Sequence, residues 1–120
     1  GIVIFMSNKY IKELEANIEQ AKDTIELGLS LERLFSNRDF KRVVLNGYFK
    51  DEAVRLVHLK GALEYQSSDA QKDIISKIDA ISNFSIYLAN IVNNAELANK
   101  TVILDEETRN EIISEDLNNG

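Results

Sequence analysis

The sequence predicts an all-α protein, and three observations carry this prediction. The chain of 120 residues contains five glycines and no proline, so little in it would interrupt a helix. Two stretches place apolar residues at alternating steps of three and four, which is the spacing of a helix that buries one face. No regular series of β-branched segments separated by turns is present. With 44% apolar residues, the chain can form one domain with one core.

The first long helix is predicted to run from its cap residue Ser7 to about Phe35. Beyond Ile25 its apolar residues spread over more than one face, which indicates burial on several sides. Gly28 lowers the helix propensity by about 1 kcal/mol relative to Ala, and it would permit either a bend or a close crossing by another helix. The heptad stripe of this helix consists of Ile11, Leu14, Ile18, Ala21 and Ile25.

Two short helices are predicted in the middle of the chain. The capping residues Ser36-Asn37 open the first, over Arg38–Asn46. Gly47 follows as a helix-stop signal. Asp51 is predicted to cap the second short helix, which ends near Tyr65 and is apolar on most sides. Such a helix is either central to the fold or part of an interface.

A second long helix is predicted over Asp69–Lys100, and a short acidic helix, capped by Asp105, over Glu106–Asp116. Two long helices of matched length, separated by short ones, predict an antiparallel pair. The stripe of the second long helix consists of Ile74, Ile78, Ile81, Ser85, Leu88, Val92 and Ala95. The expected contacts of the pair join Ile78, Ile81 and Leu88 to Ile11, Leu14 and Ile18, or to those residues of a second copy.

These elements predict three regions along the chain. Residues 1–6 are an N-terminal extension, too short for a signal peptide or a membrane span. Residues 7–104 are the helical domain, and residues 105–120 are the acidic C-terminal helix and tail. The chain has no cysteine, which excludes disulfides and cysteine nucleophiles and is typical of a reducing compartment.

Charge is segregated along the chain. The stretch Arg33–Lys60 holds seven basic and three acidic residues, whereas the remaining residues hold seven basic and seventeen acidic ones. With Tyr48 and Phe49, its cations could bind single-stranded nucleic acid by phosphate contact and stacking. Alternatively the two aromatic residues fill the core and the cations pair with the acidic long helices or with a second subunit, which the abundance of acids elsewhere favours. The cations assigned to partner binding are Arg38, Lys41, Arg42, Lys50 and Arg55.

The Leu-rich end of the first long helix and the second short helix offer more apolar faces than a two-helix pair can cover. Homo-oligomerisation is a natural way to cover the excess. The residues assigned to this interface are Leu29, Leu34, Phe35, Leu56, Leu59 and Leu63.

No pattern points to catalysis, and neither a cofactor nor a metal is expected. His58, the only histidine, has no Gly-x-Ser-x-Gly or comparable arrangement with it and is interpreted as a core or interface histidine. The acids of Glu106–Asp116 lack the spacing of a calcium loop and are interpreted as a solvated helix face. The glycines form neither of the common phosphate-binding patterns.

Residues 37–59, NRDFKRVVLNGYFKDEAVRLVHL, resemble small helical proteins encoded by tailed bacteriophages. In those proteins a Leu-rich helix leads into an Asp-Phe-Lys segment, a Gly-Tyr-Phe turn and an acidic cap that opens an apolar helix. Residues 79–92, DAISNFSIYLANIV, are similar to their second long helix. The resemblance covers most of residues 29–98, contains no active-site residue and implies a virion-associated or assembly function.

The expected function is therefore that of a non-enzymatic phage structural or assembly protein, acting through homo-oligomer and protein–protein contacts. Its expected partner is an acidic protein surface such as a phage head or portal protein, with no membrane involved. The alternative is a small binding module for nucleic acid or a host protein, acting as a regulator or inhibitor. The expected location is the cytoplasm of the infected host cell or the virion.

Overall fold

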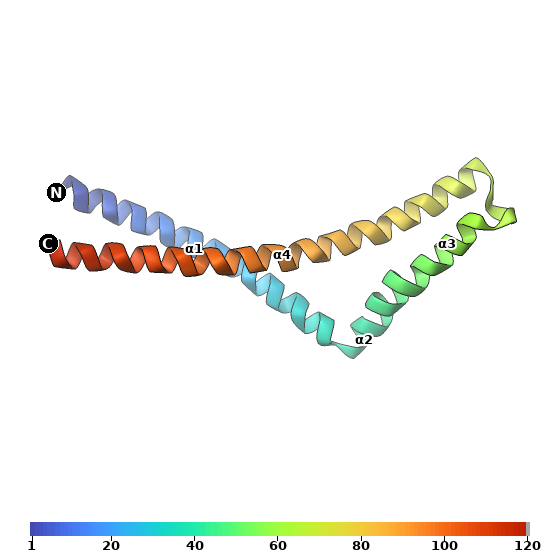
Figure 1. The fold of residues 1–120 in the computed structure, drawn as a ribbon, viewed down its shortest axis with the longest axis horizontal. Coiled ribbons are helices and arrows are strands. Elements are labelled where there is room, and N and C mark those ends of the chain that lie inside the picture. The colour runs from blue at the N-terminus through green and yellow to red at the C-terminus, as the bar shows by residue number, and fades with distance from the viewer. Residues whose placement is uncertain (120) are drawn as a thin grey trace. The chain divides into compact units, whose positions relative to one another are not determined.

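The computed structural model describes residues 1–119, and these residues form helices and no strand (Figure 1). The predicted all-α fold with two long helices is confirmed. The elements in chain order are α1 (Ile2–Ser36), α2 (Arg38–Phe40), the π-helix η1 (Lys41–Glu52), α3 (Ala53–Gly61), the 3-10 helix η2 (Leu63–Tyr65) and α4 (Ser68–Asn119).

Both long helices extend further than predicted. Helix α1 begins at Ile2, so Ser7 is an interior residue and not a cap. Helix α4 continues through Asp105, so the acidic stretch 106–116 is part of α4 and not a separate helix. Nothing in residues 100–105 is a glycine or proline, and the heptad spacing continues through them at Ala98, Val102 and Asp105. Packing along this stripe outweighs the weak helix propensity of the β-branched residues there.

The middle of the chain forms one helical run where two helices were predicted. The Asn37 cap is confirmed, because its side-chain oxygen accepts a hydrogen bond from the Phe40 backbone N–H at 2.9 Å. Gly47, however, does not have the positive φ of a helix stop, and Asp51 lies inside the run. In the wide turns of η1, a Cβ atom on Gly47 would lie 3.0 Å from the Arg42 carbonyl oxygen. Glycine therefore permits this turn instead of ending the helix.

Glutamine side chains close the connection between α3 and α4. Helix α3 ends at Gly61, earlier than the predicted end near Tyr65. Gln71 Nε2 donates to the carbonyl oxygens of Lys60 and Tyr65 at 2.9 and 2.8 Å, and Gln66 Nε2 also donates to the Lys60 oxygen. These bonds satisfy carbonyls that a helix end leaves without partners.

The chain forms two compact units, and the first consists of Gly1–Leu29 together with α4 from Ile91 onward. Its two helices are antiparallel, so the N-terminus of α1 and the C-terminal end of α4 lie at the same end (Figure 1). Leu14 and Ile18 of α1, and Ile91 and Val102 of α4, are buried.

Gly28 lies at a close approach of the two helices in this unit. A Cβ atom placed on Gly28 would lie only 2.4 Å from the Ala95 Cβ. Of the two predicted roles for Gly28, the close crossing is the one that the structure shows. Counting in heptad steps from this contact places Ala21 level with Val102, and Leu14 level with Arg109.

The second unit, Ser30–Asn90, has a different core from the one predicted. Ile74 and Ile81 of α4 cluster with Leu56 of α3, and Ile78 packs against this cluster. Ile78 and Ile81 therefore do not pack against Ile11, Leu14 and Ile18, and Leu88 is buried within the second unit as well. A stripe identifies the buried positions of a helix but not the helix that covers them.

The Gly28–Ala95 contact predicts a reciprocal pair of substitutions. We expect Gly28→Ala to destabilise the protein by about 1–3 kcal/mol, because the added methyl group forces the helices apart. In the double variant Gly28→Ala/Ala95→Gly, the Cβ atom of Ala95 is removed, and the next atoms that the new methyl group meets lie 3.9 Å away. The helix pair still contains one alanine and one glycine. Urea denaturation followed by circular dichroism should therefore place the double variant near wild type.

Gly61→Ala is the matched control, because a Cβ atom there would meet nothing within 4 Å. A double variant no more stable than Gly28→Ala alone would show that the close crossing does not limit the packing of this unit.

Candidate interaction surface

Four of the five cations assigned to partner binding lie exposed on the helical run from α2 through η1. Arg38, Lys41, Arg42 and Lys50 each present their side chains to solvent. Among the described residues 1–119, none of these four forms an ion pair. We call Arg38, Lys41, Arg42 and Lys50 the basic face. The predicted pairing of these cations with the acidic long helices is therefore not observed, and partner binding at the basic face stays a prediction.

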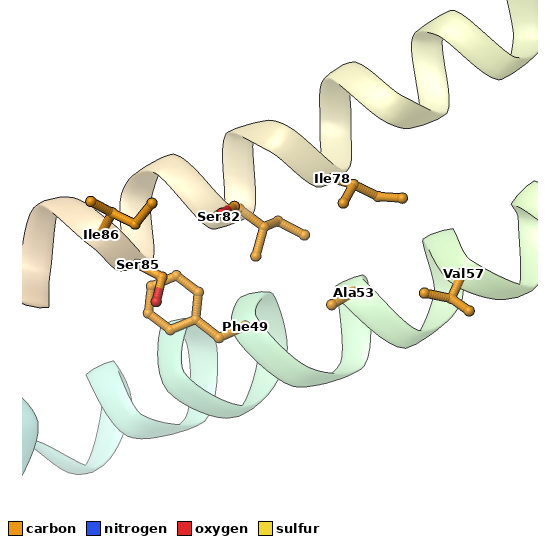
Figure 2. A pocket seen from close by; sticks show the side chains of 8 residues that line it. Phe49, Ala53, Val57, Ile78, Ser82, Ser85 and Ile86 are labelled. Atoms are coloured by element: carbon orange, nitrogen blue, oxygen red, sulfur yellow. The ribbon is translucent and has the colours of Figure 1, made fainter.

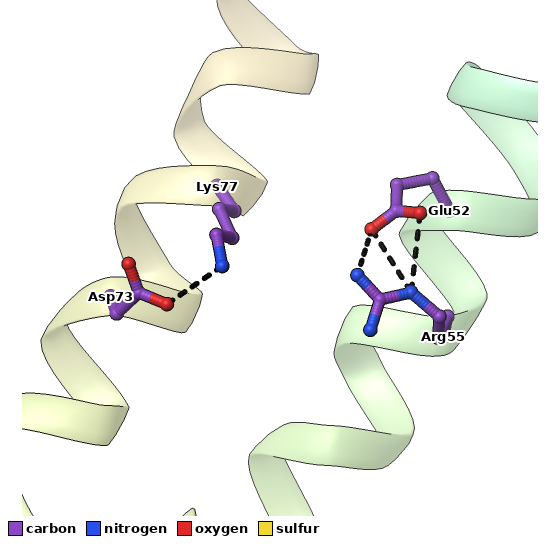
Figure 3. Close-up of polar contacts among 4 residues, drawn as sticks. All are labelled: Glu52, Arg55, Asp73 and Lys77. Atoms are coloured by element: carbon purple, nitrogen blue, oxygen red, sulfur yellow. Dashed lines mark hydrogen bonds and ion pairs between the residues drawn. The ribbon is translucent and has the colours of Figure 1, made fainter.

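Arg55 differs from these four because it already has a partner. Its Nε donates hydrogen bonds to both carboxylate oxygens of Glu52, at 3.1 and 3.2 Å, and a terminal guanidinium nitrogen contacts Glu52 Oε1 (Figure 3). The hydrogen bond to Arg55 lowers the pKa of Glu52 and raises the pKa of Arg55. On α4, Lys77 Nζ pairs with Asp73 at 2.8 Å (Figure 3).

The aromatic residues beside the basic face belong to the core. The rings of Tyr48 and Phe49 both contact Phe84 of α4, with centroid distances of 6.3 and 5.4 Å. Both side chains are half-buried and pack against the Leu56 cluster. The prediction that these two aromatic residues fill the core is confirmed. The wide turns of η1 help consecutive residues to reach the same neighbour, because they narrow the angle between successive side chains.

An apolar groove lies between the η1–α3 run and α4 within the second unit. Phe49 and Ala53 lie on one side of it and Ile78 and Ser85 on the other (Figure 2). Its volume is about 310 Å³, and the rim residue Val57 is 63% exposed. The full lining is Phe49, Ala53, Val57, Ile78, Ile81, Ser82, Ser85 and Ile86.

This groove was not predicted from the sequence. The available signal was a second row on α4 at helical spacing, which shares one residue with the main stripe and consists of Ile75, Ile78, Ser82 and Ile86.

The residues assigned to an oligomer interface have different environments. Leu29, Leu34 and Leu63 are exposed. Phe35 is half-buried against the Phe40 ring at 6.2 Å, and Leu59 packs against the core of the second unit. Leu56 is only 1% exposed, so its assignment to an interface is wrong. The apolar residues around Leu56, which suggested an interface, form the core of the second unit.

The other polar candidates do not converge on a site. His58 is exposed, which rules out the core interpretation and leaves the interface one as a prediction. Within residues 1–119, no group of three or more acidic or histidine side chains is placed to hold a metal ion. A wide hollow near the start of α1 is lined by Val3, Met6 and Tyr10 among others. Among the helices described, none carries an apolar stretch long enough to cross a membrane.

Comparison with known proteins adds no relative, since no protein-family model, curated protein or solved structure matches the chain.

The Arg55–Glu52 pair predicts a measurable change in acidity. We expect Arg55→Ala to raise the pKa of Glu52 toward its ordinary value, because the hydrogen bond from Arg55 is the largest cause of the lowered pKa. In the wild type, any stability from this pair is present above the ordinary pKa of glutamate and is lost as the pH falls through the lowered one. An NMR titration of the Glu52 carboxyl carbon would measure the change.

Lys77→Ala is the matched control, because Lys77 lowers the Glu52 pKa less than Arg55 does. Equal shifts in the two variants would mean that general electrostatics, and not the hydrogen bond, sets the acidity of Glu52.

Proposed function

We propose that this protein is a non-enzymatic structural or assembly protein that acts through helical contacts with other copies of itself and with an acidic protein partner. The observation that carries the proposal is the grouping of exposed apolar side chains on helix faces. Val43, Val54 and Val57 are exposed on the η1–α3 run, and Leu97, Ile103 and Leu104 are exposed on α4. Exposed apolar patches of this kind mark surfaces where proteins associate.

The resemblance of residues 37–59 and 79–92 to small tailed-phage proteins supports a narrower form of the proposal. In this form the protein takes part in virion assembly, and a phage head or portal protein supplies the acidic surface. The protein would then be found in the cytoplasm of the infected host cell or in the virion. Co-purification with head or portal protein from infected cells would test this form directly.

Mass in solution tests the broader form. Light scattering over a range of micromolar concentrations should give a mass above the 13.6 kDa of one chain. The mass should rise with concentration, because association follows mass action. A monomer at every concentration would contradict self-association and leave only the contact with a different protein.

A nucleic-acid-binding module is the second candidate, because the basic face is exposed. Phosphates would be attracted to Arg38, Lys41 and Arg42. Single-strand binders also present aromatic faces on which bases stack. Tyr48 and Phe49 are instead half-buried against Phe84, so the aromatic part of such a site is largely occupied. An acidic protein surface therefore fits the basic face better than a nucleic acid.

The two candidates give different results for a charge-reversed variant, Arg38→Glu/Lys41→Glu/Arg42→Glu. We expect the fold to survive, because exposed charges contribute only about 0–1 kcal/mol each. We expect binding of the acidic protein partner to weaken steeply. The matched control is Lys9→Glu/Lys12→Glu/Lys22→Glu, which makes the same change of charge on exposed residues of α1.

Binding to a single-stranded oligonucleotide at physiological salt is the companion measurement. If the wild type binds the oligonucleotide and only the basic-face variant loses it, the nucleic-acid module replaces our proposal. A variant that keeps every interaction of the wild type would show that the basic face is simply solvated.

A further inference from the structure

We infer that the apolar groove of the second unit binds the outward face of α4, residues 96–107, from a second copy of the chain. This inference rests on the proposed self-association and names the two surfaces that meet. It follows from the shape of the groove, from the charges beside it, and from the pattern of α4 residues that the first unit leaves uncovered.

The groove is built to receive apolar side chains. Its walls are mainly aliphatic and aromatic, and its rim residues Val57 and Ile86 are 63% and 55% exposed. Ile75, one turn before Ile78 on α4, is exposed as well. An open hollow of about 310 Å³ has room for the side chains of one face of a helix.

The charges beside the groove favour an acidic helix. Lys50 lies one turn before Ala53, and Lys60 lies one turn after Val57, so the η1–α3 side carries a cation near each end. Neither lysine is in an ion pair with any other of residues 1–119. On α4, Asp79 lies between Ile75 and Ile86 along the helix. The groove thus has cations toward its ends and an acid along its other side.

The outward face of α4 in the first unit has the complementary pattern. Leu97 and Leu104 are one heptad apart and exposed, while Ile91 and Val102 on the opposite side are buried. Glu96 and Glu107 lie at the two ends of this face, and Lys100 lies between them. The acids are eleven residues apart, a rise of ~16 Å, and Lys50 and Lys60 are ten residues apart, a rise of ~15 Å.

The occupant has to come from a second copy. Residues 78–86, which form one wall of the groove, and residues 96–107 belong to the same uninterrupted helix. A continuous helix cannot fold back onto its own side. The chain outside Arg33–Lys60 also has a large excess of acidic residues, so a second copy supplies the charge that the groove lacks.

A charge exchange tests the contact in the full-length protein. We expect Lys50→Glu/Lys60→Glu and Glu96→Lys/Glu107→Lys each to weaken self-association about tenfold or more in sedimentation equilibrium. An equimolar mixture of the two variants should regain wild-type association, because the acidic groove of one then meets the basic helix face of the other. Lys12→Glu/Lys22→Glu, with the same ten-residue spacing on α1, is the control and should associate like wild type.

A second variant probes the apolar part of the contact. Leu104→Asp places a charge on a side chain that is exposed in the first unit, so the fold should survive while association falls. Circular dichroism would check the fold of every variant.

The outcomes separate the two proposals. A monomeric wild type would overturn both self-association and this inference. A wild type that associates, with charge-exchange variants that associate equally well, would overturn this inference alone. This inference would also be overturned if self-association is weaker in both variants but is not restored in their mixture. The lysines and glutamates would then act at different surfaces.

Discussion

Both units depend on one constraint, which is the need to cover the apolar stripe of the uninterrupted helix α4. Ile74 and Ile81 of this helix are buried in the second unit, and Ile91 and Val102 are buried in the first. Because the stripe does not stop between them, each unit supplies its own cover. In the first unit the cover is the regular heptad face of α1. In the second it is the η1–α3 run, whose wide turns place Tyr48 and Phe49 against Phe84.

Much of the helical architecture could be predicted from local spacing. The all-α class, the stripe of α1 and the Asn37 cap all follow from residues within a few turns of one another. Gly28 was left open between a bend and a close crossing, because its neighbour Ala95 is distant in sequence. The errors share a cause. By local preference, a glycine such as Gly47 ends a helix, and aspartates such as Asp51 and Asp105 begin one. Packing of the neighbouring turns nevertheless continues the helix through each of these residues. The helix that covers Ile81 is set by the tertiary arrangement. The spacing of apolar residues in a stripe does not reveal that arrangement.

The candidate surface was predictable in part. Charge segregation identified cations that are indeed exposed, because long cationic side chains are rarely buried without partners. Charge segregation did not show that Arg55 pairs with Glu52. Two opposite charges three residues apart on a helix can pair with each other, but they can equally well bind a separate partner. The groove was missed because its walls come from helices distant in sequence. Leu56 was misassigned because an apolar residue in a mostly apolar helix suits a core and an interface equally well.

The glutamine bonds between α3 and α4 have a consequence for the order of folding. Gln71 reaches Lys60 across a separation of eleven residues, so the second unit contains a hairpin that closes at little entropic cost. The first unit instead joins positions as distant as Gly28 and Ala95. Contacts between near neighbours form faster than those between distant ones. The second unit should therefore form early and shorten the effective loop between α1 and the end of α4, so that the coiled pair of the first unit closes last.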